Sequence, residues 1–308
     1  MDSTQLLAKL RQAAFIGDSA TYSEYTDLKL LSEMSEKLRT DFPVYAVEAR
    51  AGYLLKNTTT STTSTNLSRV RIPARAFMSG LYAVECQNAQ GNYFPLEEAA
   101  PEDAYRFEQE TGALFPRKFM FSGGHITLLP APTQVVTLRL RWYIRPSQLT
   151  ASQNSKNGTD RGRITAVSGA TVTVNALPFD NAISSPAAIS SGATLDCIQT
   201  YGWYEPVVVS QPGTIAGLNI TFPIDVSQFT TVGDYVRVAD QSDWPMLPED
   251  FHDLLPNDAA LWVLAQMGLD DKSLTQKAGS QYQKFKDSLA PRKQQGGLKL
   301  PIKSFGGR

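Results

Sequence analysis

One stretch of this chain alternates plainly between apolar and polar side chains. Within residues 134–144, one set of alternate positions holds Val136, Leu138, Leu140 and Trp142, and the other holds Thr137, Arg139, Arg141 and Tyr143. Successive side chains of a β-strand point to opposite faces of the sheet, so this pattern predicts a strand with one buried face. The chain must therefore build a sheet and a core that covers it.

Shorter stretches of similar character surround this strand. They lie at residues 69–72, 81–85, 118–121 and 125–129. Turn-forming pairs such as Gln90-Gly91 and Gly123-Gly124 separate them, and Pro101-Glu102-Asp103 is typical of the start of a short helix. Residues 69–147 are therefore predicted to form a strand unit built of hairpins.

The N-terminal part is predicted to be helical. Apolar residues recur at steps of three and four over residues 3–14 and again over residues 23–40, which is the periodicity of a helix with one buried face. After the break at Pro43, residues 44–55 are expected to form a third helix. The Ser/Thr tract at residues 58–66 has no apolar side chain and is predicted to be a loop that becomes ordered only against a neighbour.

The composition changes at about residue 152 and changes back at about residue 240. Ser, Thr, Gly, Val and Asn dominate this segment, and the short runs at residues 163–167 and 171–174 flank a Ser168-Gly169 turn. Short strands in series predict a small all-β unit, either a barrel or a sandwich. Helix returns at residues 259–267 and 271–289.

These elements predict an α+β fold in four segments. Residues 1–150 and 241–290 would form one body, a helical bundle with a β-hairpin or strand unit, because each helical part has an apolar face that needs a partner. Residues 151–240 would form the inserted all-β domain. Residues 291–308 would be an extended, basic tail.

The chain offers few residues for catalysis. It contains two histidines, His125 and His252, and two cysteines, Cys86 and Cys197, which fit no zinc-binding spacing. Neither a phosphate-binding loop nor a nucleophile elbow occurs. A metal site formed by His252 with neighbouring acids is the alternative to a histidine at a helix start, which is the commoner case. We therefore expect no catalytic, cofactor or metal site, and no enzyme.

The charge balance is even overall and uneven at the C-terminal end. With 29 basic and 30 acidic side chains, the chain is no globally basic nucleic-acid binder, and no apolar run is long enough to predict a membrane span. Residues 241–271 hold seven acids and no base, whereas residues 272–308 hold nine bases and one acid.

The tail also alternates apolar with basic residues. A solvated tail rarely shows this pattern, whereas an extended strand laid on another subunit would use it. The residues predicted to dock on a partner are Arg292, Lys293, Leu298, Lys299, Leu300, Ile302, Lys303, Phe305 and Arg308.

Four segments stand in a distinctive order. They are Arg71-Ile72-Pro73-Ala74-Arg75-Ala76, Pro101-Glu102-Asp103, residues 126–132 (ITLLPAP) and residues 138–146 (LRLRWYIRP). In this order they resemble the head-to-tail connector, or adaptor, proteins of tailed bacteriophages. Residues 247–268 are similar to the closing helical hairpin of that family. The likeness covers roughly residues 20–150 and 245–290, so it says nothing of the long insertion.

The resemblance implies a structural protein of the virion, made in the host cytoplasm and placed at the head-to-tail interface. It would form a homo-oligomeric ring of about twelve copies, matching the portal, through heterologous contacts. Its partners would be the portal protein and a downstream tail or nozzle protein, with no membrane involved. Genomic DNA would pass through the bore without sequence-specific binding, because a near-neutral wall makes few phosphate contacts. The nine tail residues would then be the portal-docking site.

Two other functions are weighed against this one. A carbohydrate-binding or receptor-binding tail component is suggested by Tyr201 and Trp203, which would share one face of a strand and stack on a sugar. A DNA-binding module is suggested by Arg139, Arg141 and Arg145 along one strand face, together with the basic tail.

Overall fold

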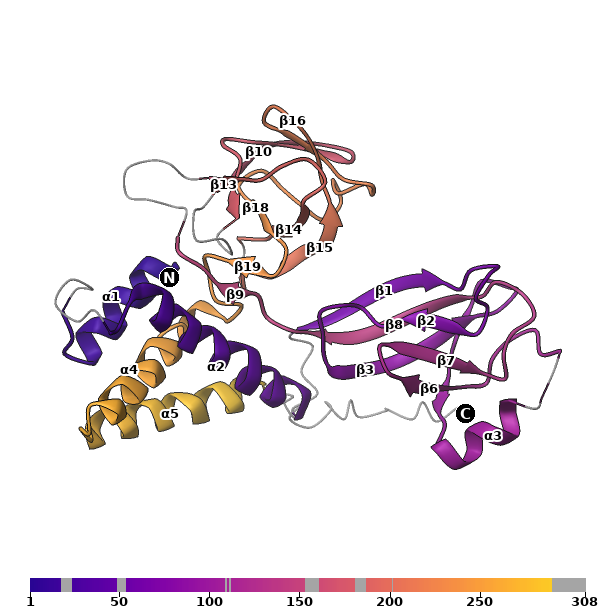
Figure 1. The fold of residues 1–308 in the computed structure, drawn as a ribbon, viewed down its shortest axis with the longest axis horizontal. Coiled ribbons are helices and arrows are strands. Elements are labelled where there is room, and N and C mark those ends of the chain that lie inside the picture. Colours follow the sequence, from indigo (N-terminus) through magenta and orange to yellow (C-terminus); the bar gives the residue numbers. More distant parts are fainter. Residues whose placement is uncertain are drawn as a thin grey trace, which may run out of the picture.

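The computed structural model describes residues 1–17, 24–48, 54–108, 110, 112–152, 161–180, 187–200 and 202–289. Four helices lie at one end of the long axis, and the strands of the segment from residue 54 to residue 144 lie at the other (Figure 1). The β-rich insertion stands beside the place where these two parts meet. Among the described residues, no helix is both long and apolar enough to cross a membrane.

The helical end consists of α1 (Ser3–Ala13), α2 (Asp27–Glu48), α4 (Leu254–Gln266) and α5 (Lys272–Leu289). A capping box starts α1, because the Asp2 carboxylate accepts from the Gln5 backbone N–H at 2.9 Å and the Gln5 amide oxygen accepts from the Asp2 N–H at 3.0 Å. Helix α4 contacts all three other helices and is correspondingly apolar. The periodic segments at residues 3–14, 23–40, 259–267 and 271–289 are thus helical over most of their length.

Helix α2 differs from the expectation in its second half. It continues through Pro43 to Glu48, so the predicted break and the separate helix at residues 44–55 are wrong. Phe42 and Ala46 are fully buried on either side of the proline, and their packing holds the chain in the helix across it.

The first sheet contains β1 (Leu55–Ser61), β8 (Thr137–Ile144), β3 (Ala76–Gln87) and β4 (Tyr93–Pro95), all antiparallel in the order β1-β8-β3-β4. Strand β8 is the alternating strand predicted at residues 134–144. Strand β1 includes residues 58–61 of the tract predicted to be a loop at residues 58–66, so the prediction is wrong for this part of the tract. Threonine is β-branched and suits a strand, and β8 supplies the hydrogen bonds that the tract needs.

The second sheet contains β2 (Arg69–Arg71), β7 (His125–Leu129), β6 (Lys118–Ser122) and β5 (Glu97–Glu98), in the order β2-β7-β6-β5. The short helix α3 (Pro101–Glu108) packs Ala104 near Leu129 at its edge. Ile126 and Leu128 on β7 are fully buried in the same hydrophobic core as the helices. One core therefore joins both sheets to the helical end.

The expected helical-bundle body is wrong. The described residues form nineteen strands but five α-helices, and all of these strands lie between α2 and α4. The physical reason is that the apolar faces of the helices do not close a bundle by themselves. They meet at one end and share a core with residues of the first sheet, such as Val84 and Leu140.

The insertion is built of short antiparallel strands. Its larger sheet has the order β10-β11-β17-β16, from β10 (Ile164–Ser168), β11 (Thr171–Val174), β17 (Asn219–Thr221) and β16 (Thr214–Ala216). A three-stranded sheet contains β15 (Pro206–Pro212), β14 (Thr194–Ile198) and β18 (Tyr235–Val238), and β12 (Phe179–Asp180) pairs with β13 (Ala187–Ala188). The predicted hairpin around Ser168-Gly169 is present, with Gly169 at φ 56°.

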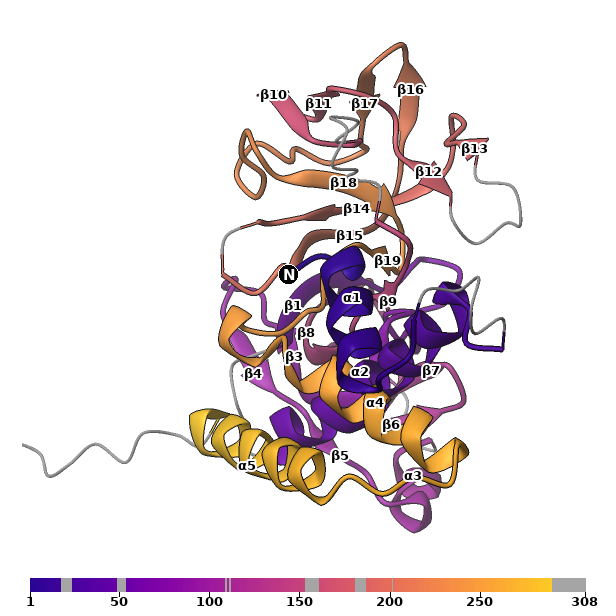
Figure 2. The same ribbon diagram turned by 90° about the vertical axis from the view of Figure 1, so that its left-hand side faces the viewer.

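The insertion has a hydrophobic cluster of its own, with Val172, Leu195, Ile220 and Val236 fully buried. Its two ends return to the body side by side, because β9 (Gln148–Leu149) and β19 (Gln241–Ser242) pair in parallel. Figure 2 shows this crossing close to α1 and α2, with the insertion standing above the helices.

Candidate functional site: the junction of insertion and body

The nine tail residues predicted to dock on the portal all lie outside the described residues, as does Tyr201. Within the described residues, no group of three or more histidine, cysteine or acidic side chains is placed to hold a metal ion. Cys86 and Cys197 are free and buried, and burial raises the pKa of Cys86 to about 11. Burial therefore keeps this thiol protonated and unreactive at neutral pH.

His252 is fully buried and has both ring nitrogens engaged. Nδ1 accepts from the Met1 amine at 2.7 Å, and Nε2 donates to the Leu247 carbonyl at 2.9 Å. Burial, together with the positive charge of the Met1 amine, lowers the pKa of His252 to about 4. The ring is neutral at pH 7 and joins the start of α1 to the segment before α4, so the alternative of a metal site at His252 has no free nitrogen to use.

This arrangement predicts acid sensitivity. Between about pH 6.5 and pH 4 the unfolded chain binds a proton at His252 and the folded chain does not, so the free energy of unfolding falls as the pH falls through this range. The loss attributable to this residue at pH 4.5 is about 2 to 3 kcal/mol. Urea titrations at pH 7 and pH 4.5 should show it for the wild type, and His252→Gln should have a smaller pH dependence. An equal slope in both proteins would contradict the assignment.

The aromatic residues weighed as a sugar-stacking face are arranged differently. Trp203 and Tyr204 lie in the turn between β14 and β15, where Tyr204 has a φ of 52°. The Tyr204 ring stacks on Trp244, with centroids 5.5 Å apart, and its hydroxyl donates to Glu249 at 2.7 Å. Tyr204 thus packs and forms a hydrogen bond within the chain, and Trp203 lies in a turn and not on a strand.

The arginines weighed as a DNA-binding stripe also have partners within the chain. Arg139 and Arg141 both pair with Glu85 on β3, Arg141 at 3.1 Å, and Arg139 lies over the Tyr93 ring at 4.3 Å. Arg145 lies 3.6 Å from Asp240. Each of these three arginines therefore has an acidic partner within the chain, although Glu85 and Asp240 are each shared with another arginine.

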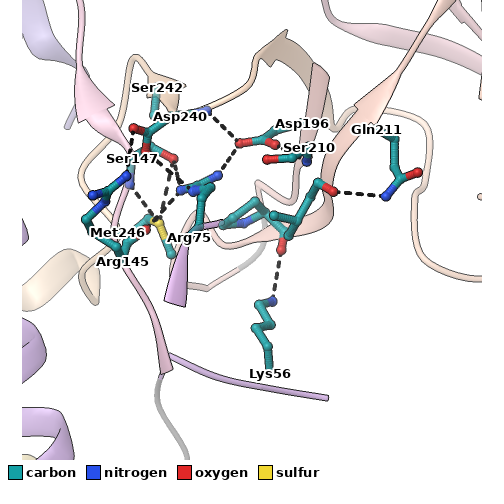
Figure 3. A network of polar contacts seen from close by, with 12 residues as sticks. Lys56, Arg75, Arg145, Ser147, Asp196, Ser210, Gln211, Asp240, Ser242 and Met246 are labelled. Atoms are coloured by element: carbon teal, nitrogen blue, oxygen red, sulfur yellow. Dashed lines mark hydrogen bonds and ion pairs between the residues drawn. The ribbon is translucent and has the colours of Figure 1, made fainter. Parts of the chain in front are cut away.

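The most elaborate polar cluster joins the insertion to the body (Figure 3). Arg75 follows β2 in the chain, and its side chain is 4% exposed. It forms an ion pair with Asp196 of β14 and donates to the Arg145 carbonyl at 3.0 Å and the Ser147 hydroxyl at 2.9 Å. One guanidinium therefore connects the strand unit to the middle of the insertion.

Asp196 is completely buried. Besides Arg75, it accepts from the backbone N–H of Ser210 at 2.7 Å and of Asp240 at 3.1 Å. Burial raises the pKa of this carboxyl, and Arg75 and the two N–H groups oppose that rise. The partners satisfy the carboxylate, so it serves as a fixed anchor within the insertion.

Asp240, just before β19, gathers three arginines. Arg39 of α2 lies 2.8 Å from it, Arg75 3.4 Å and Arg145 3.6 Å. Lys56 of β1 adds a further link, because it pairs with Glu205 and donates to the Pro206 carbonyl at 2.9 Å. The junction thus ties α2, β1 and the end of β8 to the insertion.

A second buried ion pair lies within the insertion's return to the body. Arg237 of β18 and Asp243 are 1% and 0% exposed and lie 2.7 Å apart, and Arg237 also donates to the Arg161 carbonyl at 2.6 Å. Gly162, at φ 74°, lies against Arg237 with no space for a side chain, since an added Cβ would lie 2.5 Å from a guanidinium nitrogen.

Sequence reasoning missed the acids of the junction. Asp196 stands between Leu195 and Cys197, in a stretch with few charges, and an acid inside an apolar strand is a recognisable signal of a buried ion pair. Nothing in the sequence indicates that its partner is Arg75, 121 residues away.

Neither a family model nor a curated protein matches this chain significantly. Each of the arginines and aspartates of the junction has an ion-pair partner within the chain, although the Nε atoms of Arg75 and Arg145 and Oδ1 of Asp240 are buried without a hydrogen bond.

Proposed function

We propose that this protein is a structural adaptor that forms a ring between the portal and the tail of a tailed bacteriophage. The proposal rests on the place where two of the segments that resemble the adaptor family meet. Arg75 comes from the Arg71–Ala76 segment and Arg145 from the segment at residues 138–146, and both lie against Asp240. Residues that carry the likeness thus hold the body and the insertion together, as a structural role requires.

The shape of the molecule supports head-to-tail association. In a closed ring each copy meets its two neighbours through two different surfaces. Helices α1 and α3 lie towards opposite ends of the long axis (Figure 1), and each has a large exposed side chain on it or next to it, Phe15 after α1 at 78% and Tyr105 on α3 at 67%. In the proposed ring these side chains would lie against neighbouring copies.

The other parts of the proposal follow from the resemblance. The ring has about twelve copies, its partners are the portal and a downstream tail or nozzle protein, and DNA passes through the bore during ejection. The basic tail contacts the portal. The protein belongs to the virion at the head-to-tail interface.

Native mass spectrometry of the purified protein, alone and mixed with its portal, tests this function. We expect a ring of about twelve subunits that binds the portal, and a chain ending at Leu289 that binds it at least roughly tenfold more weakly. A full-length chain that stays monomeric and ignores the portal would contradict the proposal.

A further inference from the structure

Strand β1 is an open edge of the first sheet. It pairs with β8 on one side, and no described strand pairs with its other side. Seven residues long, it contains no proline or bulge that would protect such an edge, and its one lysine, Lys56, is already bound to Glu205 and the Pro206 carbonyl. Unprotected edges of this kind pair readily with another strand.

The hydrogen-bond pattern identifies the groups on the open side. The Ile144 N–H donates to the Leu54 carbonyl at 2.8 Å, and the Thr62 N–H donates to the Val136 carbonyl at 3.0 Å. Since antiparallel pairing alternates, even-numbered residues between 54 and 62 direct their backbone groups to β8 and odd-numbered residues direct theirs outward. Asn57 and Thr59 therefore present their N–H and C=O groups on the open edge.

A groove of about 530 Å³ runs beside this edge, between the first sheet and β15. Leu140 and Trp142 of β8 contribute apolar side chains to it, and Val207 and Val209 contribute from β15. Phe229, 45% exposed, lies at the same groove. A strand added to β1 would direct every second side chain towards these apolar groups.

The neighbouring edge strand β15 is already protected. Lys56 donates to the Pro206 carbonyl at 2.9 Å, and the Gln211 side chain donates to the Val209 carbonyl at 3.2 Å (Figure 3). Prolines stand at both ends of β15. Of the two edges at the groove, β1 is therefore the one able to accept a strand.

We infer that the groove accepts residues 297–303 of a neighbouring copy, added to β1 as an extra strand. In this segment Leu298, Leu300 and Ile302 alternate with Lys299, Pro301 and Lys303. The apolar set faces the groove, and the basic set faces the opposite side of the sheet. In a strand with one free edge, Pro301 is accommodated because its missing N–H points to solvent.

The chain length suits this exchange between copies. Leu298 lies nine positions after Leu289 at the end of α5, which gives an extended reach of roughly 30 Å. A tail and an edge on the same chain are two different surfaces, so docking repeats from copy to copy and gives a ring where the rotation between copies closes. The inference rests on the proposed function and assigns the apolar positions of the tail to the neighbour, leaving Arg292, Lys293 and Arg308 to the portal.

Two variants separate the edge from the tail. Thr59→Pro removes an outward N–H without touching the bonds to β8, and Thr59→Val is its control. Leu298→Thr/Leu300→Thr/Ile302→Thr removes the apolar face of the tail, and Lys299→Thr/Lys303→Thr is its control. Native mass spectrometry should show subunit association weakened at least roughly tenfold in both variants and unchanged in both controls.

Mixing tests whether the tail of one copy binds the edge of another copy. Thr59→Pro retains the tail, and a chain ending at Leu289 retains the edge. Each should be monomeric alone, and together they should give a one-to-one heterodimer. Failure to form this heterodimer, with both proteins folded by circular dichroism, would overturn the inference.

The outcomes also distinguish the two proposals. A wild-type ring that survives both Thr59→Pro and the triple tail substitution overturns the inference and leaves the adaptor function standing. A wild-type chain that forms no ring overturns both.

Discussion

Asp196→Asn is expected to destabilise the protein by about 3 to 5 kcal/mol, because it leaves the buried Arg75 guanidinium with only Asp240, which Arg39 and Arg145 share, as a counter-charge. The cost of an unpaired buried charge far exceeds the net contribution of the pair itself. Urea unfolding followed by fluorescence at pH 7 would measure the loss as a lower transition midpoint. The insertion should be affected first, since Asp196 lies at its centre and also holds Ser210 and Asp240.

Two controls belong to this experiment. Asp250→Asn removes a carboxylate from an exposed residue and should leave the midpoint unchanged. Arg75→Met combined with Asp196→Leu removes both charges and should recover most of the lost stability. A single Asp196→Asn variant as stable as the wild type would show that the junction does not depend on this pair.

Phe285→Ala is expected to cost about 3 to 5 kcal/mol. The Phe285 ring is fully buried and contacts Phe42 of α2 and Phe251 before α4, with both centroids 5.2 Å away. Its removal leaves a cavity where three helical segments meet. Thermal unfolding followed by circular dichroism at 222 nm would register the loss, because α5 depends on this contact to stay on the body.

Phe15→Ala is the matched control. It removes the same atoms from a side chain that is 78% exposed, so the free energy of unfolding should change by no more than about 0.5 kcal/mol. If the Phe285 variant behaved like the Phe15 variant, α5 would contribute little to the core. If Phe15→Ala instead weakened ring formation, that would place Phe15 in a contact between copies.

The junction determines how the insertion acts within the proposed ring. Asp240 contacts arginines from both α2 and the end of β8, and Arg75 reaches Asp196 from the body. Because these links approach from different elements, we expect the insertion to move with the body as one unit. A docking surface for a tail protein would then keep a fixed orientation in every copy.

Much of the secondary structure could be predicted because its signals are local. The apolar spacing of residues 3–14 and 271–289 matches α1 and α5, and the alternation of residues 134–144 matches β8. The hairpin around Ser168-Gly169 also follows from turn chemistry between two short β-rich runs. In each case the local sequence pattern and the tertiary surroundings of the element favour the same secondary structure.

The failures occur where a distant partner overrides the local pattern. Residues 55–61 contain mostly polar side chains. They form a strand because they pair with β8, where Thr58 lies opposite Leu140. Residues 44–48 continue α2 because buried neighbours such as Ala46 hold the helix past Pro43. A short stretch of the sequence includes neither β8 nor the buried neighbours of α2. Its local pattern therefore predicts a loop at the first site and a helix break at the second.

The same distinction applies to the site. The helices near the two ends of the described chain, the alternating strand and the β-rich insertion are all indicated by local patterns, because hydrophobic periodicity involves neighbouring residues. The core shared by helices and sheets, the contact between Arg75 and Asp196 and the open edge of β1 beside a groove follow from tertiary contacts alone. Ion pairs and sheet edges depend on contacts between residues far apart in the chain, and no local pattern encodes which residues meet.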